Sequence, residues 1–449
     1  MMRSMKKGNP TSAFVAPEVR LLLACCRAPD APETAGLLDA ALTGLTLETA
    51  AGLGGAPSHR RIDWGTFAAL TRNHGLQPLA HAHLGERTDV PQETRHRLAA
   101  ESDRVARNNL VQAAILHGLV DDLTAAGAAP LVLKGQPLGA FLYGDPALRP
   151  AGDLDLLVRP ADLDRAAAVL AGRGYELLED YGPLTPRRRD ALRRAGKHYH
   201  YAQPDTRSHV ELHWEPVTRY GRRHPPAGFW WDGTRLEFLD GRPVPVLGLS
   251  RTLLQLAVHG GGHLWERLLW AVDVAELFRR LDTDTLEETF RLAGWLGFEA
   301  HLIVAAALAT DNLETPLPRA SRLLLSHATE PRNGRTILRS ARGLAAARAH
   351  HTPAGTVRRL AAGAPWNGGL PATLRRTVEL ALMASPTDWQ AIPLPDRFFP
   401  LYHLIRPLRV GLKYARGLGG ECRSRRIPRS GHTGRSSSGP AGLHRPRGR

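Results

Sequence analysis

The stretch LYGDPALRPAGDLDLLVRP at 142–160 limits the possible folds more than any other part of the chain. It places Asp153 and Asp155 inside the most strand-like run of the sequence, although aspartate is disfavoured in strands. Side chains at positions i and i+2 of a strand share a face, about 6.6 Å apart along the chain. Both carboxylates are therefore expected to point the same way, while Leu154 and Leu156 face the core. Two like charges this close repel unless a cation lies between them.

A divalent cation is one explanation for the paired aspartates. Mg²⁺ is usually held by one or two carboxylates together with substrate phosphates. The alternatives are that both side chains are exposed at the end of a strand, or that one of them caps the following helix. The Asp-x-Asp pattern alone does not decide between these interpretations.

A third carboxylate stands on a second expected strand, HVELHW at 209–214. There Glu211 and His213 share one face, and Val210 and Leu212 take the other. An acid on a neighbouring strand is what a two-metal site for phosphoryl transfer requires. His213 is expected to be a residue beside the metal, a proton-handling group or a structural histidine. The alternative for Glu211 is an ordinary exposed strand position.

The segments around these residues predict a mixed α/β region. The run APLVLKG at 129–135 is typical of a buried strand, and 161–174 of a helix that ends at Gly174. The segments 197–204 and 208–216 alternate polar and apolar residues, which predicts an antiparallel pair. Asp240-Gly241 lies between two extended runs and predicts a hairpin.

Helical spacing of apolar residues dominates on both sides of this region. The long pattern that ends near Gly127 closes the first helical part, and helices return after Leu249. We therefore expect five segments along the chain. They are a disordered N-terminus at 1–15, a helical region at 16–125, an α/β core at 126–250, a helical C-terminal domain at 251–420, and a disordered basic tail at 421–449.

The net charge of +16 is concentrated at the C-terminus, where eight arginines and no acid fall within 422–449. This tail is rich in Ser, Gly, Pro and Arg, which favours disorder. A solvated tail is the first interpretation, and an arm that contacts anionic partners is the second. No uninterrupted run approaches the roughly 18 apolar residues of a membrane span, and no apolar core of signal-peptide length follows the N-terminus. The expected location is cytoplasmic, and Cys25 and Cys26 are expected to pack as small hydrophobic residues.

A longer segment at 131–177, LVLKGQPLGAFLYGDPALRPAGDLDLLVRPADLDRAAAVLAGRGYEL, resembles the uncharacterised nucleotidyltransferases of the DNA polymerase beta-like superfamily. The resemblance rests on Leu-Lys-Gly, then Leu-Tyr-Gly, then Arg, and then Gly-Asp-x-Asp-Leu-Leu-Val. The later segments VELHW and AVHGGGHLWERLLWAVDVAEL are also similar to that family. The similarity spans about residues 105–280.

The resemblance implies an α/β (α+β) nucleotidyltransferase palm core flanked by N- and C-terminal helical domains. It implies that Asp153, Asp155 and Glu211 hold Mg²⁺ or Mn²⁺, with two ions in the site. It also implies that Gly135 lets the backbone approach the triphosphate. The wider superfamily has Gly-Ser at this point, whereas Gln136 follows the glycine here. Because Gln136 lacks a hydroxyl, nucleotide binding is expected to depend on backbone N–H groups and on two cations, Lys134 and Arg149.

Two further groups of histidines stand out in the sequence. His259, His263 and Glu266 suggest a zinc helix, but the metalloprotease pattern needs Glu directly after the first His. We therefore expect His263, Arg267 and Asp273 to be packing residues or substrate contacts. The run KHYHY at 197–201 is expected to line an acceptor pocket or to form an ordinary strand surface.

The sequence thus predicts transfer of an NMP group from an NTP to an unidentified acceptor, with release of pyrophosphate. The acceptor could be a small molecule, a peptide, a protein or RNA. One alternative is a non-catalytic palm-like domain that binds a nucleotide, peptide or protein partner as a biosynthetic accessory. A second alternative is an RNA-binding protein that uses its basic tail.

Overall fold

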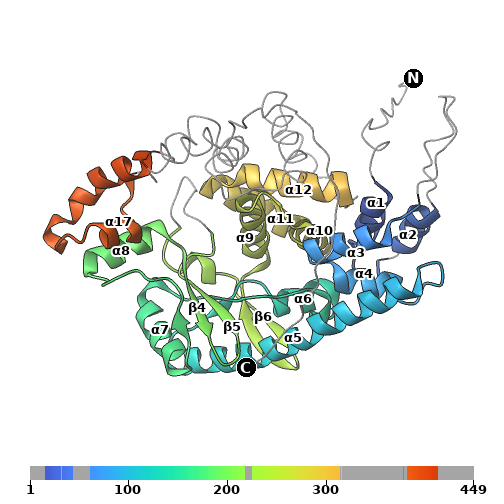
Figure 1. The fold of residues 1–449 in the computed structure, drawn as a ribbon, viewed down its shortest axis with the longest axis horizontal. Helices are drawn as coiled ribbons and strands as arrows, with labels where there is room; N and C mark the ends of the chain where they lie inside the picture. The colour runs from blue at the N-terminus through green and yellow to red at the C-terminus, as the bar shows by residue number, and fades with distance from the viewer. Residues whose placement is uncertain are drawn as a thin grey trace, which may run out of the picture.

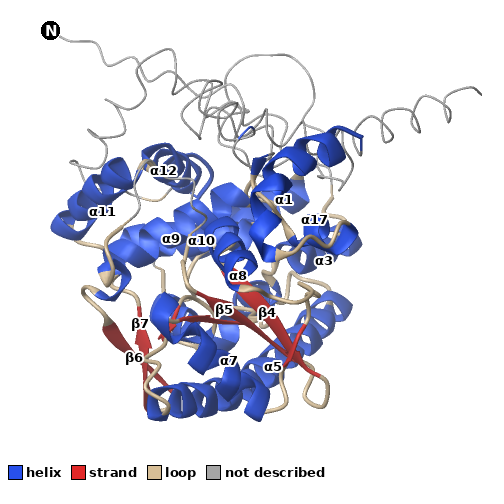
Figure 2. Ribbon diagram, turned by 90° about the vertical axis from the view of Figure 1, so that its left-hand side faces the viewer, coloured by secondary structure: helices blue, strands red, loops and turns tan. Residues whose placement is uncertain are grey.

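The computed structural model describes residues 16–31, 33–43, 61–217, 225–313, 315, 378 and 382–412. In this part of the chain a seven-stranded mixed sheet lies between helices (Figure 1; Figure 2). The predicted mixed α/β class is confirmed, and the division into separate flanking domains stays a prediction. The expectations for 1–15 and 421–449 lie outside the described residues.

In the described residues, five helices precede the first strand. They are α1 (Pro17–Ala24), α2 (Thr34–Thr43), α3 (Trp64–His74), α4 (Gln77–Leu84) and α5 (Gln92–Ala125). The long helix α5 ends just before Gly127, whose φ of 77° is left-handed backbone that favours glycine, as predicted for a helix stop. Cys25 and Cys26 are buried in the core next to these helices, which confirms their expected role as small hydrophobic residues.

The sheet has the strand order β3-β4-β5-β2-β1-β7-β6. The strands are β1 (Leu131–Val132), β2 (Leu154–Leu157), β3 (Glu176–Leu177), β4 (His198–Gln203), β5 (Ser208–His213), β6 (Arg235–Leu239) and β7 (Arg242–Val246). At the centre, β2 pairs antiparallel with β1 and parallel with β5. The chain therefore leaves and re-enters the middle of the sheet through helices rather than through tight turns.

Both predicted hairpins are confirmed. Strands β4 and β5 form an antiparallel pair, and so do β6 and β7. The second hairpin turns at Asp240 and Gly241, whose φ angles of 50° and 74° are both positive. A two-residue turn with positive φ at both positions is the form that matches the twist of the flanking strands, which explains the Asp-Gly sequence.

Helices connect and cover the strands. They are α6 (Gln136–Tyr143), α7 (Leu163–Gly172) and α8 (Pro186–Ala195), with short 3₁₀ turns at Pro146–Leu148, Pro160–Asp162 and Phe229–Trp231. The basic run RRRDALRRA at 187–195 lies in α8. After the sheet come α9 (Leu249–Gly262), α10 (Leu268–Arg280), α11 (Thr283–Leu296), α12 (Glu299–Leu313) and α17 (Pro386–Ala391).

The two faces of the sheet centre carry different side chains. Leu154 and Leu156 of β2, with Val210 and Leu212 of β5, are buried in a core that includes residues of α5 and α7. The alternation predicted for both strands is confirmed. The acidic positions of these strands consequently face the opposite side, where α9 and α10 lie (Figure 2).

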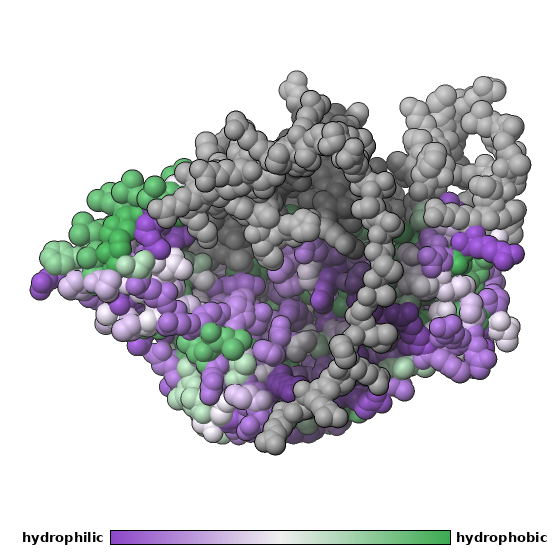
Figure 3. Space-filling view, viewed as in Figure 1, coloured by the Kyte–Doolittle hydropathy of each residue, from purple (hydrophilic) through white to green (hydrophobic). Residues whose placement is uncertain are grey.

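The C-terminal described segment carries an apolar stripe. A 3₁₀ turn at Asp396–Leu401 leads into a helical run at 402–412, and Leu404, Leu408 and Leu412 are exposed along it. Apolar residues gather at this end of the molecule, beside α8 and α17 (Figure 3). Among the described helices, none is both long and apolar enough to cross a bilayer.

Candidate active site

Strand pairing brings the three predicted carboxylates together. Asp153 stands one residue before β2 and is exposed, whereas Asp155 lies inside β2 and is buried. In the parallel pairing of β2 with β5, Asp155 is the register partner of Glu211. Because register partners in neighbouring strands project from the same face, the three acids form one patch on the sheet.

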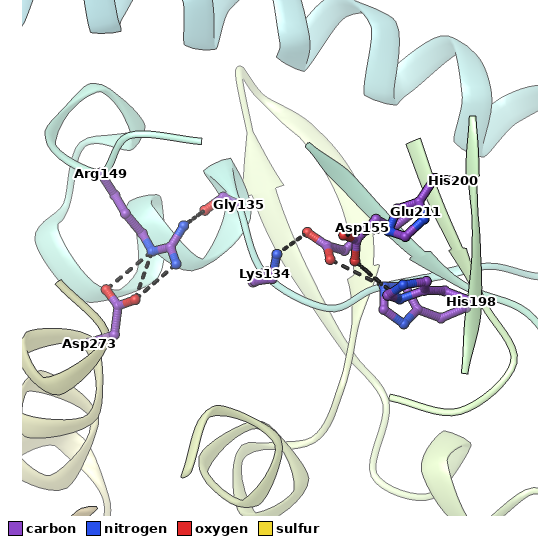
Figure 4. Close-up of polar contacts among 9 residues, drawn as sticks. Lys134, Gly135, Arg149, Asp155, His198, His200, Glu211 and Asp273 are labelled. Atoms are coloured by element: carbon purple, nitrogen blue, oxygen red, sulfur yellow. Dashed lines mark hydrogen bonds and ion pairs between the residues drawn. The ribbon is translucent and has the colours of Figure 1, made fainter. Parts of the chain in front are cut away.

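A lysine from the neighbouring strand end already contacts this patch (Figure 4). Lys134 comes two residues after β1, and its Nζ lies 2.5 Å from Asp155 Oδ2. Burial alone would raise the pKa of Asp155, but the Lys134 ammonium and the hydrogen bond and charge of His213 hold it below its ordinary value. Lys134, predicted to bind phosphate, is therefore the counter-ion of the buried acid of this patch.

Three histidines surround the carboxylate of Glu211 (Figure 4). The antiparallel register places His200 opposite Glu211 and His198 opposite His213. His213 Nε2 lies 3.0 Å from Glu211 Oε2 and 3.2 Å from Asp155 Oδ1. His198 Nδ1 is 3.3 Å from Glu211 Oε2, and His200 Nε2 is 3.5 Å from Oε1. Glu211 and His213 of β5, both predicted as site residues, thus lie beside two histidines of β4. For these two histidines, the sequence left an acceptor pocket and an ordinary strand surface as alternatives.

The protonation of this group follows from its contacts. Burial and the charge of His213 lower the pKa of His198 to about 3, so this imidazole is neutral at pH 7. The hydrogen bond with Glu211, opposed by burial and supported by Glu179, raises the pKa of His200 to about 9. Burial would raise the pKa of Glu211, but its hydrogen bonds with His200 and His213 hold it below its ordinary value. An ionised carboxylate therefore lies between one cationic and one neutral imidazole.

Asp153 shows that negative charge still dominates at the edge of the patch. Although its side chain reaches solvent, the surrounding protein partly withdraws the carboxyl from water, which raises its pKa, and the charges of Asp155 and Glu211 raise it further. A divalent cation would relieve this repulsion. Carboxylate oxygens are the donors that Mg²⁺ and Mn²⁺ accept, so the residues fit the ions that the resemblance implies.

The predicted nucleotide-binding Arg149 lies in a buried ion pair. Its Nε lies 3.1 Å from both oxygens of Asp273, and its Nη2 lies 2.9 Å from Oδ2. Tyr143 donates its hydroxyl to Asp273 Oδ1 at 2.9 Å, and Arg149 Nη1 lies 3.5 Å from the carbonyl oxygen of Gly135. The structure thus pairs Arg149 with Asp273, one of the three predicted accessory residues. The contact of Arg149 with Gly135 links this ion pair to the loop before α6 (Figure 4).

Gly135 occupies backbone space that other residues rarely adopt. Its φ is 86° and its ψ is −140°, immediately before α6. A Cβ at this position would meet no atom within 4 Å, so backbone conformation rather than crowding calls for glycine. The next residue, Gln136, is buried, and its Nε2 makes no hydrogen bond with the described part of the chain.

The end of α9 forms a neutral aromatic border to the site. The rings of His259 and His263 lie 5.2 and 5.1 Å from the ring of Trp270, measured between centroids. Burial, with the charges of Lys134 and Lys197, lowers the pKa of both histidines. Within the described residues, they belong to no group with metal-ligand spacing, so the zinc helix gains no support. The ring of His263 packs near that of Trp270, and a substrate contact for this residue stays a prediction.

The sequence predicted the place of His198 and His200 only in part. In β4, Tyr199 and Tyr201 enter the core while His198 and His200 take the acidic face. Strand alternation predicts that split, but only the register with β5 shows that the histidines meet Glu211. The link between Tyr143 and Arg149 had no local signal, because both contact a helix more than a hundred residues later.

Comparison with known proteins agrees with this geometry. A family described as uncharacterised nucleotidyltransferase matches residues 60–314, which is more than half of the chain and more than the 105–280 of the sequence resemblance. No curated protein and no solved structure matches. The match supports nucleotidyl transfer in general and, with it, an NTP substrate. Because the matched residues include the whole sheet and the helices around it, the chain belongs to the family of uncharacterised nucleotidyltransferases.

Proposed function

We propose that this protein is a metal-dependent nucleotidyltransferase. An acceptor nucleophile attacks the α-phosphorus of an NTP, the new bond forms there, and the bond to pyrophosphate breaks. The observation that carries the proposal is the register of β2 and β5, which sets Asp155 beside Glu211, with Asp153 two residues before Asp155. Bound Mg²⁺ or Mn²⁺, two ions in this proposal, would neutralise charge on the attacking and leaving oxygens.

Lys134 has two tasks in this proposal. Without substrate its ammonium balances Asp155 at 2.5 Å. Once a cation takes over that carboxylate, the same ammonium is free to pair with phosphate oxygens, for which lysine is a common ligand. The exchange keeps the buried charges balanced in both states, which matters because an unpaired buried charge is costly.

Arg149 acts by position in this proposal. Its contact with the Gly135 carbonyl and its ion pair with Asp273 hold the loop that leads into α6. Backbone N–H groups at the start of that helix are available for an anion, because the first turn of a helix leaves such groups without intrahelical partners. The nucleotide phosphates would lie against this loop.

A pocket next to Lys134 offers room for another part of a substrate. It lies between α6 and the β6–β7 hairpin and is lined by residues that include Phe141, Arg235 and Thr252. The guanidinium of Arg235 stacks on Phe141 at 4.5 Å from the ring centroid. A flat base or an apolar acceptor group would suit this mostly apolar surface.

The test is a label-transfer assay with the four NTPs, each labelled at the α-phosphate, with Mg²⁺ or Mn²⁺ and cell extract as a source of acceptor. Wild type should transfer label, and Asp153→Asn and Asp155→Asn should lose it by about 10³-fold, since this chemistry depends on charge neutralisation. Asp164→Asn, which removes an exposed acid of α7, is the matched control and should transfer normally.

Three outcomes would contradict the proposal. Transfer that survives in Asp155→Asn at the wild-type rate would remove the carboxylates from the mechanism. Absence of label with every NTP, together with absence of cation-dependent nucleotide binding, would favour the non-catalytic binding domain. Label from γ-labelled but not α-labelled NTP would instead indicate phosphoryl transfer.

A further inference from the structure

The acidic face of the sheet has two chemically different halves. On the β2 side the available donors are carboxylate oxygens, those of Asp153 and Asp155. On the β4–β5 side the donors are imidazole nitrogens grouped about one carboxylate, those of His198 and His213 about Glu211. Mg²⁺ takes oxygen ligands, whereas imidazole suits Zn²⁺ and its transition-metal neighbours. The second half therefore does not match the ion expected for the first.

The three ligand atoms of this second half already converge. One atom each from His198, Glu211 and His213 lie within 4.8 Å of one another. Glu211 Oε2 is 3.0 Å from His213 Nε2 and 3.3 Å from His198 Nδ1. A tetrahedral ion about 2.1 Å from each ligand would hold them about 3.4 Å apart. Two of the three pairs are thus already near the spacing that such an ion requires, and the third pair lies within 4.8 Å.

The contact between His198 and Glu211 is not a hydrogen bond. His198 Nδ1 is buried and has no hydrogen-bond partner in the described part of the chain, although Glu211 Oε2 is only 3.3 Å away. The two atoms are close without being aligned with each other, as ligands are when they face a common point. Burial of a polar nitrogen without a partner is costly, and a bound cation would remove that cost.

The surroundings hold the ligands in place from both sides. The imidazole of His213 is 2% exposed and packs edge-on against that of His198, with 4.7 Å between ring centroids. His200, the next histidine of β4, is engaged by Glu179 and contacts the other oxygen of Glu211 at 3.5 Å. With His200 engaged elsewhere, His198, His213 and Glu211 remain as protein ligands. Three ligands leave one position of a tetrahedral ion open, as in catalytic rather than structural zinc sites.

We propose that His198, His213 and Glu211 bind one divalent transition metal of the Zn²⁺ class, beside the carboxylate pair that would take Mg²⁺ or Mn²⁺. The site joins β4 to β5 at the edge of the acidic face. It shares Glu211 with the proposed transferase centre but does not require that the protein transfer nucleotides. Zinc binding and nucleotidyl transfer can therefore succeed or fail separately.

The experiment uses the full chain, stripped of metal with a chelator, loaded with Zn²⁺ and passed through a desalting column before zinc is counted per chain. His198→Gln and Glu211→Gln should each retain one ion fewer than wild type. His209→Gln, which removes an exposed histidine of the same strand β5, is the matched control and should retain the wild-type amount. Millimolar Mg²⁺ should not displace the ion.

A spectroscopic readout covers variants that fold poorly. Cu²⁺ loaded at one equivalent should show nitrogen hyperfine coupling in electron paramagnetic resonance, and His198→Gln should reduce it. Circular dichroism of each metal-free variant checks its fold. Wild-type zinc content in His198→Gln, or a Cu²⁺ spectrum without nitrogen coupling in the wild type, overturns the proposal. Asp153→Asn should keep its zinc, and if it also keeps transfer, the transferase proposal fails alone.

Discussion

Two buried ion pairs lie on either side of Gly135, and they differ in what surrounds the acid. Asp273 is fully buried, and its two oxygens accept from Arg149 and from the Tyr143 hydroxyl. Asp155 is equally inaccessible, but it stands beside Glu211, and its ammonium partner Lys134 is 19% exposed. The first acid is surrounded by donors alone, and the second by another acid as well.

The difference separates a structural pair from an exchangeable one. The guanidinium of Arg149 meets Asp273 through two nitrogens, which fixes both side chains, and the tyrosine adds a third donor. Lys134 meets Asp155 through a single nitrogen on a flexible stem. A ligand or cation can displace the lysine without leaving a buried charge, because its ammonium can turn to solvent. No such path exists for Arg149.

The largest effect is expected from Asp273→Ala. Removal of this acid leaves the Arg149 guanidinium buried without its counter-ion, so the free energy of unfolding should fall by about 3–5 kcal/mol. Asp155→Asn, in metal-free buffer, should lower it by less than about 1.5 kcal/mol, since the freed lysine can reach water. Urea denaturation followed by circular dichroism measures both, and equal losses would erase the proposed distinction.

A smaller change is expected from Tyr143→Phe. This substitution removes a hydrogen bond to a charged acceptor, which should cost about 1.5 kcal/mol of unfolding free energy. Tyr175→Phe serves as the control, because its hydroxyl contacts the neutral Ser208 and should be worth about 1 kcal/mol. A Tyr143→Phe protein as stable as the wild type would show that Asp273 does not need its third donor.

The exchangeable pair should respond to cations instead. Lys134→Gln removes the ammonium that competes for Asp155, so affinity for Mn²⁺ should rise by about tenfold, or roughly 1.4 kcal/mol. Lys134→Arg keeps the positive charge and should stay near the wild-type affinity. Titration of free Mn²⁺ by electron paramagnetic resonance measures both variants. Unchanged affinity in Lys134→Gln would mean that lysine and metal do not share this carboxylate.

The weakest expected effect is on how the free energy of unfolding changes at low pH. The pKa of Asp155 in the folded protein lies below its ordinary value near 3.8, so the unfolded chain takes up this proton at a higher pH than the folded chain. Stability from this group is present above about pH 4 and is lost as the pH falls below it. Asp155→Asn should therefore show a shallower fall of unfolding free energy below pH 4 in metal-free buffer. Between pH 6 and 8 the two slopes should coincide.

Local patterns predicted much of this fold. Alternation placed Leu154 and Leu212 in the core, Asp-Gly placed the second hairpin, and Gly127 placed the end of α5. Each of these signals is a property of a few adjacent residues, so the sequence displays it directly.

The contacts between the site residues could not be predicted from adjacent residues in this way. Arg149 and Asp273 are 124 positions apart, and each on its own is consistent with a substrate contact. The encounter of Glu211 with the two histidines of β4 depends on the register of β4 and β5, which tertiary packing decides. The residues of the candidate site could thus be predicted one by one. Only the structure shows that they form a structural ion pair (Arg149 with Asp273), an exchangeable ion pair (Lys134 with Asp155) and a histidine cluster around Glu211.

The helix α5 has a consequence for how the protein can be dissected. With 34 residues it is about 51 Å long, and it packs on α3 and α4 at one end and on α7 and β7 at the other. Leu116, Leu119 and Leu123 lie in the same core as Leu154 and Leu156. A fragment that begins at residue 126 would expose that core to water, so the smallest self-supporting unit with the acidic patch has to start upstream of this helix.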